Sequence, residues 1–364
     1  MLELINVSKR VGNEMHIQDV SIRLESGSLN VLLGPTLSGK TSLMRLMAGL
    51  DRPSSGDIRV NGNSVVGVSV QKRDVAMVYQ QFINYPTLTV YENIASPLRV
   101  ARLDKKLIDN KVRAAADLLK LADFLSRMPA DLSGGQQQRT ALARALVKGS
   151  KLVFLDEPLA NLDYKLREEL RQELPRVFAE SGAILVYAST EPSEALLLGG
   201  NTATLSQGRV TQFGSTIEVF QRPLDLRTAQ IFSDPPLNTL FVQKRGHSLY
   251  FNVLEIPLMQ TQSQAQLPDA NYTLALRPYH LSLEKSHSAM LAVDGNVLVT
   301  EITGSETFVH VSVENQRWVA LLHGVKNLEI GAVITLYFDP GNFYLFDELG
   351  CLAATPAKAA LRRR

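Results

Sequence analysis

The sequence predicts an α/β domain over residues 1–232, followed by a smaller all-β domain over residues 233–352 and a tail over residues 353–364. In the first domain, short apolar runs alternate with longer segments of helical period, which is typical of βα units around a largely parallel sheet. Beyond Ser233-Asp234-Pro235-Pro236 the runs are short and alternating, with turn residues between them, as in a small barrel-like β domain. The length of 364 residues also fits two domains.

The first domain contains one stretch that departs from the βα rhythm. Between Asn84 and Gly149, after a turn at Pro86, the apolar residues follow a helical period and few strand candidates occur. This pattern indicates a helical subdomain inserted between two strands of the sheet. In chain order, the expected elements are a strand over 29–34, a helix over 40–50, a strand over 76–79, helices over 107–121 and 136–147, a strand over 151–156 and a helix over 165–181.

The second domain shows strand candidates only. Alternating apolar residues predict strands over 273–277, 307–313, 317–322 and 332–338. The tail from Ala353 to Arg364 ends in three arginines and lacks apolar periodicity, so we expect a frayed, solvated segment. A contact of this basic tail with a membrane surface is the alternative.

The composition excludes several classes of protein. Lys and Arg number 38 against 36 Asp and Glu, and the net charge of +2 lacks the excess of a dedicated nucleic-acid binder. The single cysteine, Cys351, excludes an internal disulfide and a cysteine-rich zinc site, which fits a reducing, cytosolic compartment. No apolar run approaches about 18 residues, and the first residues lack an export signal. We therefore expect a chain that is neither exported nor membrane-spanning.

A phosphate-binding loop is predicted directly after the first strand. Residues Gly34 to Thr41 fit the pattern G-x-x-x-x-G-K-[ST] and lie between an apolar strand and an apolar-periodic helix, as this motif requires. Glycines let backbone N–H groups approach phosphates, and the helix N-terminus adds a favourable dipole. Lys40 would then reach the β- and γ-phosphates, and Thr41 would hold Mg²⁺. The alternative is a glycine-rich turn with an exposed lysine.

Two acidic residues end the apolar strand over 152–157. A buried strand that carries carboxylates at its carboxyl end is where an α/β sheet places a ligand site. Asp156 is the expected Mg²⁺ partner, and Glu157 is the expected base for an attacking water. A solvated strand end would look the same, but the position after the phosphate loop favours the functional interpretation.

A second helix start also has the composition of an anion site. Leu132 to Arg139 reads Leu-Ser-Gly-Gly-Gln-Gln-Gln-Arg, and Ser133 could simply cap the helix. Exposed N–H groups at a helix start also bind anions. Because one nucleotide cannot easily occupy two distant sites of one chain, this start points to a composite site that two subunits share.

In this order the motifs resemble those of the ATP-binding subunit of ABC transporters. The five motifs are Gly34 to Thr41 (Walker A), Gln80 after the strand over 76–79, the signature Leu132 to Arg139, Asp156-Glu157-Pro158 (Walker B), and Leu162-Asp163. The second domain is similar to the TOBE or OB-like regulatory domain of the sugar and polyol importer branch. That similarity lies in Leu276-Arg277-Pro278-Tyr279-His280, Gly304-Ser305-Glu306-Thr307 and Leu345-Phe346-Asp347.

The resemblance implies a P-loop ABC ATPase domain that uses ATP and Mg²⁺. It implies catalytic roles for Glu157, Gln80 and Thr190, and metal contacts for Thr41, Gln80 and Asp156. The implied nucleotide contacts are Val11, Gly34, Pro35, Thr36, Leu37, Ser38, Gly39, Lys40, Thr41, Ser42, Ser133, Gly134, Gly135, Gln136 and Asp163.

The resemblance also implies an assembly. Two ATPase subunits enclose ATP between the phosphate loop of one and the signature of the other, and two transmembrane permease subunits dock near Gln80 and Phe82 to Thr89. The transported substrate arrives from an extracytoplasmic binding protein. The chain would lie peripherally on the cytoplasmic face of the inner membrane, with no nucleic-acid partner.

Three residues depart from the family pattern. Val11 stands where an aromatic residue normally stacks on adenine, and Leu37 stands where the loop commonly has glycine. The usual Y-V-T-H-D run reads Tyr187-Ala188-Ser189-Thr190-Glu191, so Thr190 replaces the switch histidine. Threonine can still donate a hydrogen bond to the γ-phosphate, but it is shorter and cannot become cationic.

These departures all lie on the Walker A side, whereas the signature matches the family. This pattern favours a heterodimer with a second, more typical ATPase over a homodimer. Two-ATPase versions of the importer branch that the chain resembles move glycerol or related polyols, so the resemblance implies such a molecule as the transported substrate. One alternative is a nucleotide-binding subunit with a degenerate site that gates its partner without significant hydrolysis. Thr190 favours that alternative and Glu157 opposes it. Another alternative is a soluble ABC ATPase that acts on nucleic acid or the ribosome.

Overall fold

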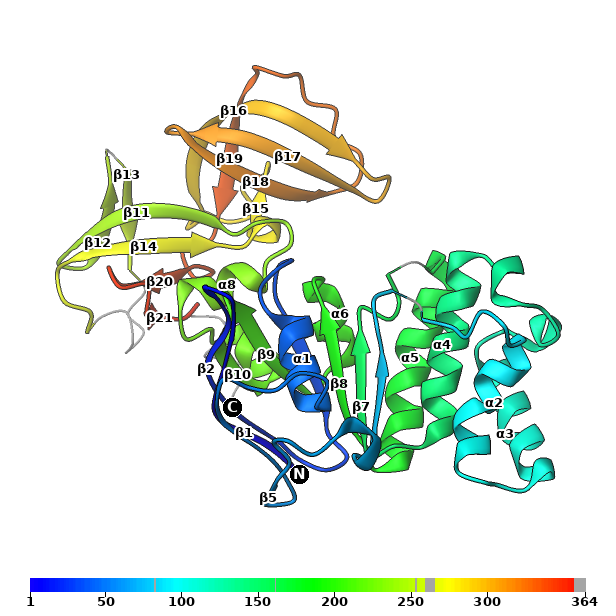
Figure 1. The fold of residues 1–364 in the computed structure, drawn as a ribbon. Coiled ribbons are helices and arrows are strands. Elements are labelled where there is room, and N and C mark those ends of the chain that lie inside the picture. Colours follow the sequence, from blue (N-terminus) through cyan, green and yellow to red (C-terminus); the bar gives the residue numbers. More distant parts are fainter. Residues whose placement is uncertain (82, 161, 253, 259–265, 357–364) are drawn as a thin grey trace. The chain divides into compact units, whose positions relative to one another are not determined.

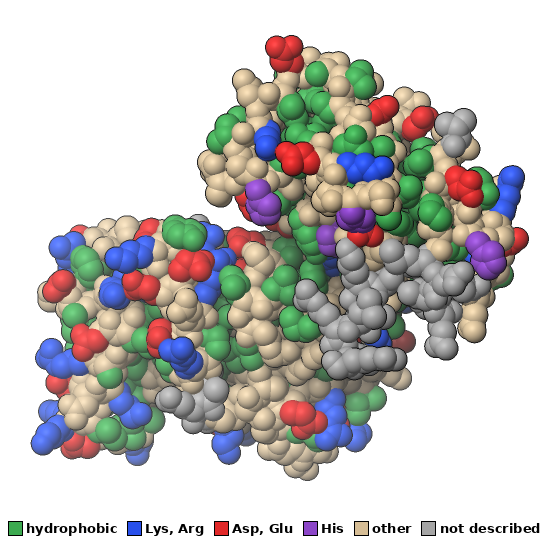
Figure 2. Space-filling view, turned by 180° about the vertical axis from the view of Figure 1, so that it is seen from behind, with side chains coloured by type: hydrophobic (Ala, Val, Ile, Leu, Met, Phe, Trp, Pro, Cys, Tyr) green, Lys and Arg blue, Asp and Glu red, His purple; other side chains and the backbone are tan. Residues whose placement is uncertain are grey.

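The computed structural model describes residues 1–81, 83–160, 162–252, 254–258 and 266–356 (Figure 1). The chain divides into two compact units, Met1–Thr216 and Ile217–Arg364. Within the described part of the chain, no helix is long and apolar enough to cross a membrane. On the face drawn in Figure 2, side chains of both charge signs are interspersed over the first unit and form no single-sign patch. This mixture agrees with the small net charge.

The first unit is built on a six-stranded sheet of order β10-β9-β3-β8-β7-β6. Its parallel strands are β9 (Asn201–Ser206), β3 (Leu29–Leu33), β8 (Ile184–Ser189), β7 (Leu152–Asp156) and β6 (Val75–Val78), and β10 (Arg209–Ser215) is antiparallel to β9. Every residue of β7 and β8 is buried, as expected where helices cover both faces of a parallel sheet. The helices α1 (Lys40–Ala48), α5 (Tyr164–Ser181) and α6 (Pro192–Leu198) follow β3, β7 and β8.

A second sheet in this unit was not predicted. The antiparallel order β2-β1-β4-β5 joins β1 (Leu2–Val11), β2 (Glu14–Leu24), β4 (Ser55–Val60) and β5 (Asn63–Ser64). The two long strands form a hairpin whose two-residue connection, Gly12-Asn13, has a positive φ of 57° at Gly12. This sheet shares one hydrophobic core with α1 and the parallel sheet. The expectation of βα units from the first residue onwards is therefore wrong for residues 2–24 and 55–64, whereas the strand over 29–34 and the helix over 40–50 are confirmed as β3 and α1.

The helical insertion lies between β6 and β7, which pair with each other directly. It contains α2 (Val90–Val100), α3 (Lys105–Leu118) and α4 (Gly134–Lys148), which lie together beside the sheet in Figure 1. Capping sets where these helices begin. Thr89 and Glu92 form a capping box at α2, and Asp104 accepts a hydrogen bond from the backbone N–H of Lys106 at α3. As a result α3 begins before the predicted range 107–121, and it ends at Leu118, before that range ends.

Two antiparallel sheets form the second unit after α7 (Thr216–Gln221) and α8 (Leu226–Ile231). One consists, in order, of β13 (Leu254–Pro257), β12 (Ser248–Phe251), β11 (Asn238–Arg245), β14 (Asn271–Leu276), β20 (Tyr344–Phe346) and β21 (Leu352–Ala354). The other consists of β15 (Leu281–Ser282), β19 (Val333–Phe338), β16 (Leu291–Ile302), β17 (Glu306–Val313) and β18 (Gln316–His323). Both contribute to one hydrophobic core, in which Trp318 Nε1 donates a hydrogen bond to the carbonyl of Thr239 at 3.1 Å.

The two ends of the second unit differ from the sequence-based expectation. Its first helices belong with the β strands because Arg277 donates hydrogen bonds to the carbonyls of Phe220 and Phe232, both at 2.9 Å. The division therefore falls after Thr216, before the expected boundary at residue 232. At the other end β21 pairs with β20, so the start of the tail is a strand and is not frayed. Residues 357–364 of the tail lie outside the described residues.

Candidate functional site

The carboxyl ends of four neighbouring parallel strands carry the expected site residues. The phosphate loop follows β3, Gln80 follows β6, Asp156 ends β7 with Glu157 next to it, and Thr190 follows β8. Because parallel strands end at the same edge of the sheet, these side chains lie close together. A cavity of about 570 Å³ opens there, lined by Glu14, Met15, His16, Thr36, Leu37, Gly39, Lys40, Thr41, Ser42, Gln80, Glu157, Thr190, Gln207 and Gly208.

The phosphate loop is packed so closely that its first glycine cannot be replaced. A Cβ atom at Gly34 would lie 2.4 Å from the carbonyl oxygen of Leu205. Gly39 caps α1 with a φ of 105°, in the range that favours glycine. Leu37 has a φ of 65° and is 96% exposed, so a leucine occupies the left-handed conformation here. Leucine at this position therefore carries a conformational cost that glycine would not have.

Lys40 is the buried cation of the site. Its ammonium group donates hydrogen bonds to the carbonyls of Gly34 at 2.8 Å and Pro35 at 3.0 Å, and its side chain is 6% exposed. Burial lowers the pKa of Lys40, while the charges of Glu157 and Asp156 act in the opposite direction. Lys40 Nζ lies 3.9 Å from Glu157 Oε1. A buried ammonium held against a phosphate loop provides strong attraction for a polyphosphate.

Thr41 and Asp156 form a pair of oxygen donors. Thr41 Oγ1 donates a hydrogen bond to Asp156 Oδ2 at 2.7 Å, although the two residues belong to different βα units. Asp156 is 2% exposed, and burial raises the pKa of its carboxyl against the opposing effects of Thr41 and Lys40. A hydroxyl and a single carboxylate beside a phosphate loop fit Mg²⁺, which usually takes one or two carboxylates together with phosphate oxygens.

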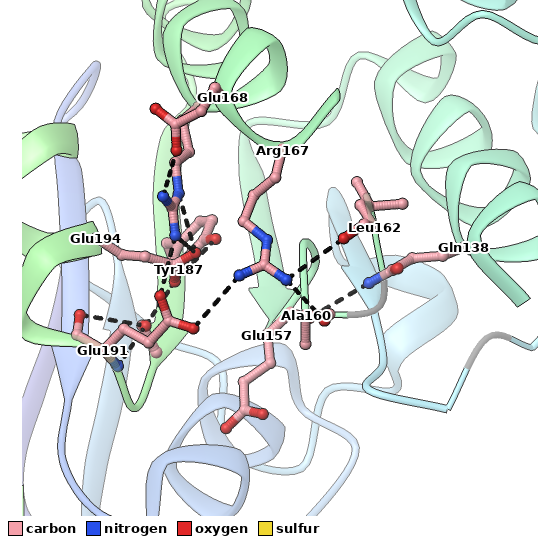
Figure 3. A network of polar contacts seen from close by, with 11 residues as sticks. Gln138, Glu157, Ala160, Leu162, Arg167, Glu168, Tyr187, Glu191 and Glu194 are labelled. Atoms are coloured by element: carbon pink, nitrogen blue, oxygen red, sulfur yellow. Dashed lines mark hydrogen bonds and ion pairs between the residues drawn. The ribbon is translucent and has the colours of Figure 1, made fainter. Parts of the chain in front are cut away.

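Glu157 stands at the junction of three elements. Gln80 Nε2 donates a hydrogen bond to its carboxylate at 3.1 Å. Gln138 Nε2 on α4, drawn beside Glu157 in Figure 3, donates to its backbone carbonyl at 3.4 Å. Its φ of 48° is unusual for a non-glycine residue and turns the chain sharply after β7. Burial raises the pKa of the Glu157 carboxyl, the charge of Lys40 lowers it, and Asp156 raises it again. These are properties of a carboxylate suited to general-base chemistry.

Thr190 lines the same cavity and is exposed. The remaining predicted residues divide between the surroundings of the cavity and other surfaces. Gly34, Pro35, Ser38 and Asp156 do not line it but are hydrogen-bonded to residues that do. Lys40 donates to the carbonyls of Gly34 and Pro35, Thr41 donates to Asp156, and the N–H of Gly208 donates to the carbonyl of Ser38. The other predicted residues absent from its lining are Val11, Ser133, Gly134, Gly135, Gln136 and Asp163.

The signature segment forms the start of α4 away from this cavity. Ser133 and Gln136 form a capping box in which each side chain accepts a hydrogen bond from the other residue's backbone N–H. Gly134 is exposed, and a Cβ atom at this position would meet nothing within 4 Å. The helix start therefore presents a bare backbone to its surroundings, as a site completed by a second subunit requires.

The two hairpins β1–β2 and β9–β10 contribute a wall of the cavity that was not predicted from the sequence. Met15 and His16 on β2 line the cavity, whereas Val11 ends β1 opposite Glu14. The prediction that Val11 makes the contact is therefore not supported by the lining. The Gln207-Gly208 turn between β9 and β10 also lines the cavity. Both hairpins have two-residue turns with positive φ at glycine, a sequence signal that could have revealed the hairpins but not their pairing.

Comparison with known proteins establishes the family. The model of the ABC transporter family matches residues 17–160, and that of the TOBE domain matches residues 274–346. The trehalose/maltose import ATP-binding protein MalK of Thermococcus litoralis is 33% identical over 364 aligned residues, which cover 95% of this chain and 97% of the relative. The chain belongs to the ABC transporter ATP-binding family.

Other ABC proteins support this assignment. The xylose/arabinose import ATP-binding protein XacK of Haloferax volcanii is 33% identical, covering 92% of this chain and 89% of the relative. The multiple sugar-binding transport ATP-binding protein MsmK of Streptococcus mutans is 31% identical, covering 95% and 97%. A dimeric structure of the ATP-binding cassette MJ0796, bound to ADP and Pi, is 26% identical with a TM-score of 0.56, covering 59% of this chain and 99% of that chain. The chain is an ABC-type ATPase with a P-loop domain followed by an all-β TOBE domain.

Proposed function

We propose that this chain is the ATP-hydrolysing subunit that powers ABC-type import of a carbohydrate or polyol, with glycerol or a related polyol as the first candidate. One observation carries the proposal: Lys40, Thr41, Gln80 and Glu157 line a single cavity at the strand ends. The import proteins that match over nearly their full length support the transport role, because their names refer to sugars.

The residues of the chain divide the chemistry among them. Lys40 neutralises the charge of the β- and γ-phosphates, and the loop N–H groups hold them. Glu157 takes the proton of the attacking water, and the hydrogen bond from Gln80 fixes the orientation of its carboxylate. Thr190 donates its hydroxyl to the γ-phosphate.

Mg²⁺ and the base of ATP have their own contacts. Thr41, Asp156 and Gln80 would hold Mg²⁺, which supplies charge neutralisation to the phosphates when bound. Met15 and His16, which line the cavity from β2, offer the base an apolar and an aromatic surface in place of Val11.

We further propose that this chain pairs with a second, more typical ATPase subunit. A composite site built on this chain's phosphate loop contains the left-handed Leu37 and the short Thr190, whereas the signature helix start is capped and open. A partner's phosphate loop facing Ser133 and Gly134 would then form the faster site. Two permease subunits would hold the pair at the cytoplasmic face of the inner membrane, and an extracytoplasmic binding protein would deliver the substrate.

Nucleotide binding tests the site itself. Lys40→Ala removes the charge that faces the phosphates, so we expect ATP affinity of the full-length chain to fall by at least about 100-fold. Lys105→Ala, an exposed lysine in the helical insertion, is the matched control. Equal affinity of the two variants would show that ATP binds elsewhere. We expect the assembled transporter that carries Lys40→Ala to lose the contribution of this site to ATPase activity.

A second candidate function is favoured by Thr190. Without a residue that can become cationic, this chain could bind ATP and gate its partner without significant hydrolysis. The retained contact between Gln80 and Glu157 opposes this candidate, because a non-hydrolysing site does not need an oriented base. Hydrolysis that disappears with Glu157→Gln in this chain alone would exclude it.

A further inference from the structure

The residue after Thr190 is held by two arginines of helix α5. The Glu191 carboxylate lies 3.0 Å from Arg171 Nη2 through Oε2 and 3.7 Å from Arg167 Nη1 through Oε1. Arg167 and Arg171 are four residues apart on α5, so they project from one face of the helix and reach the same carboxylate. Figure 3 shows the contact of Arg167 with Glu191.

Arg167 also holds the chain that follows Glu157. Its Nη2 donates hydrogen bonds to the carbonyls of Ala160 at 3.1 Å and Leu162 at 3.4 Å. In Figure 3 the Arg167 guanidinium lies between these carbonyls on one side and Glu191 on the other. One side chain thus connects the segment after the expected base to the segment that carries Thr190.

Buried side chains hold the carboxyl end of β8, which precedes Thr190. Glu194, whose side chain is 8% exposed, accepts hydrogen bonds from Ser189 Oγ at 2.6 Å, Tyr187 OH at 3.2 Å and Arg171 Nη2 at 3.0 Å. The backbone N–H of Glu191 donates to Ser189 Oγ at 2.9 Å. Ser189 is therefore fixed by buried contacts and holds the backbone N–H of Glu191, whereas the Glu191 carboxylate is held by Arg167 and Arg171.

We propose that Glu191 is a positioning residue for ATP hydrolysis, which sets the backbone of Thr190 through its ion pairs with Arg167 and Arg171. This inference rests on the proposed function. Threonine has one short hydroxyl, so its distance from a γ-phosphate is set by the backbone and cannot be corrected by a long side chain. A displacement of about 1 Å in a reacting geometry can reduce a rate by up to about 100-fold.

The exposure of the Glu191 carboxylate indicates that its ion pairs contribute little to the stability of the fold. The Glu191 side chain is 44% exposed, whereas those of Arg167 and Arg171 are 25% and 10% exposed. Ion pairs with a solvated partner contribute little to stability. Loss of the Glu191 carboxylate should therefore leave the fold intact, and a rate effect of the Glu191 variants would report on geometry.

The test measures single-turnover ATP hydrolysis by the assembled transporter with the glutamate that ends the partner subunit's Walker B strand disabled. We expect Glu191→Gln, which removes the charge, and Glu191→Asp, which shortens the reach, to lower the rate about three- to tenfold. Arg167→Ala should lower it similarly, and Arg167→Lys should restore part of it. ATP affinity and the melting temperature should stay near those of the wild type. Arg176→Ala on the same helix, whose partner Glu173 is also on α5, is the matched control.

A double-mutant cycle decides whether the effect passes through Thr190. In a Thr190→Ala background, Glu191→Gln should cause no further loss, because the hydroxyl that it positions is absent. Equal loss in both backgrounds, unchanged rates in the Glu191 and Arg167 variants, or a parallel fall in ATP affinity and stability would overturn the inference. If the variants give one of these results while the wild-type chain hydrolyses ATP, the inference is wrong but the proposed function still holds. If the wild-type chain shows no Glu157-dependent hydrolysis, both the inference and the proposed function are wrong.

Discussion

Leu37 occupies a conformation that a leucine adopts only at a cost. Its φ of 65° places it in the left-handed region, where a side chain costs roughly 1–2 kcal/mol, and its exposed side chain gains no packing in return. Leu37→Gly removes this strain but increases the entropy of the unfolded chain, so we expect a net gain in unfolding free energy of up to about 1 kcal/mol. Denaturant titration measures it. Leu37→Ala keeps the strain, and a gain as large as that of the glycine variant would contradict the explanation.

Glu157 should make stability depend on pH in a defined direction. Burial raises the pKa of its carboxyl above the ordinary value of 4.5, so the folded chain holds a proton that the unfolded chain has lost in the interval between the two values. The unfolding free energy contributed by this group therefore falls as pH rises through the folded-state pKa. Asp156, whose pKa burial also raises, acts in the same direction.

Glu157→Gln cannot titrate and isolates this effect. We expect the melting temperature of the variant to rise relative to the wild type as pH increases from about 5 to about 8. Calorimetry of both proteins across this range gives the difference directly. A difference that stays constant or shrinks with increasing pH would mean that Glu157 is not destabilised by burial.

At the scale of elements, a substitution at the start of α4 should affect the activity of the assembled transporter but not the stability of the isolated chain. Gly134→Leu adds a side chain where a Cβ atom meets nothing within 4 Å, so the isolated chain should keep its melting temperature. The same side chain would block a partner's nucleotide, and ATPase activity of the assembled transporter should be largely lost. Ser133→Ala is the contrasting variant, because loss of a cap costs about 1 kcal/mol of stability. Full activity of Gly134→Leu would exclude this helix start from the nucleotide site.

Local motifs made much of the site predictable, and long-range pairing made the rest unpredictable. The phosphate loop and the Asp156-Glu157 strand end could be recognised because their spacing along the chain determines their geometry. The parallel sheet then brings Gln80 and Thr190 to the same edge. The wall that we propose contacts adenine was not predictable, because the register of the β1–β2 hairpin decides which of its residues face the cavity.

At the scale of the whole molecule, the fold class was predictable from composition and periodicity, whereas the boundary between its units was not. Turn residues near 233–236 suggested a boundary there, but Arg277 fastens the preceding helices to the β strands from a distant point in the sequence. Hydrogen bonds to backbone carbonyls, like those from Arg277, cannot be predicted from the residues that accept them, because every residue has a carbonyl.

The central claim for the whole molecule is that this chain hydrolyses ATP at its own cavity, slowly, because Thr190 stands at the end of β8. Single-turnover hydrolysis in the assembled transporter, with the glutamate that ends the partner subunit's Walker B strand disabled, tests it most directly. We predict slow hydrolysis that Glu157→Gln abolishes and that Thr190→His accelerates about tenfold or more, as a well-placed hydrogen-bond donor does at other sites. Bound ATP with no Glu157-dependent hydrolysis, or fast hydrolysis with Thr190 in place, would contradict the claim.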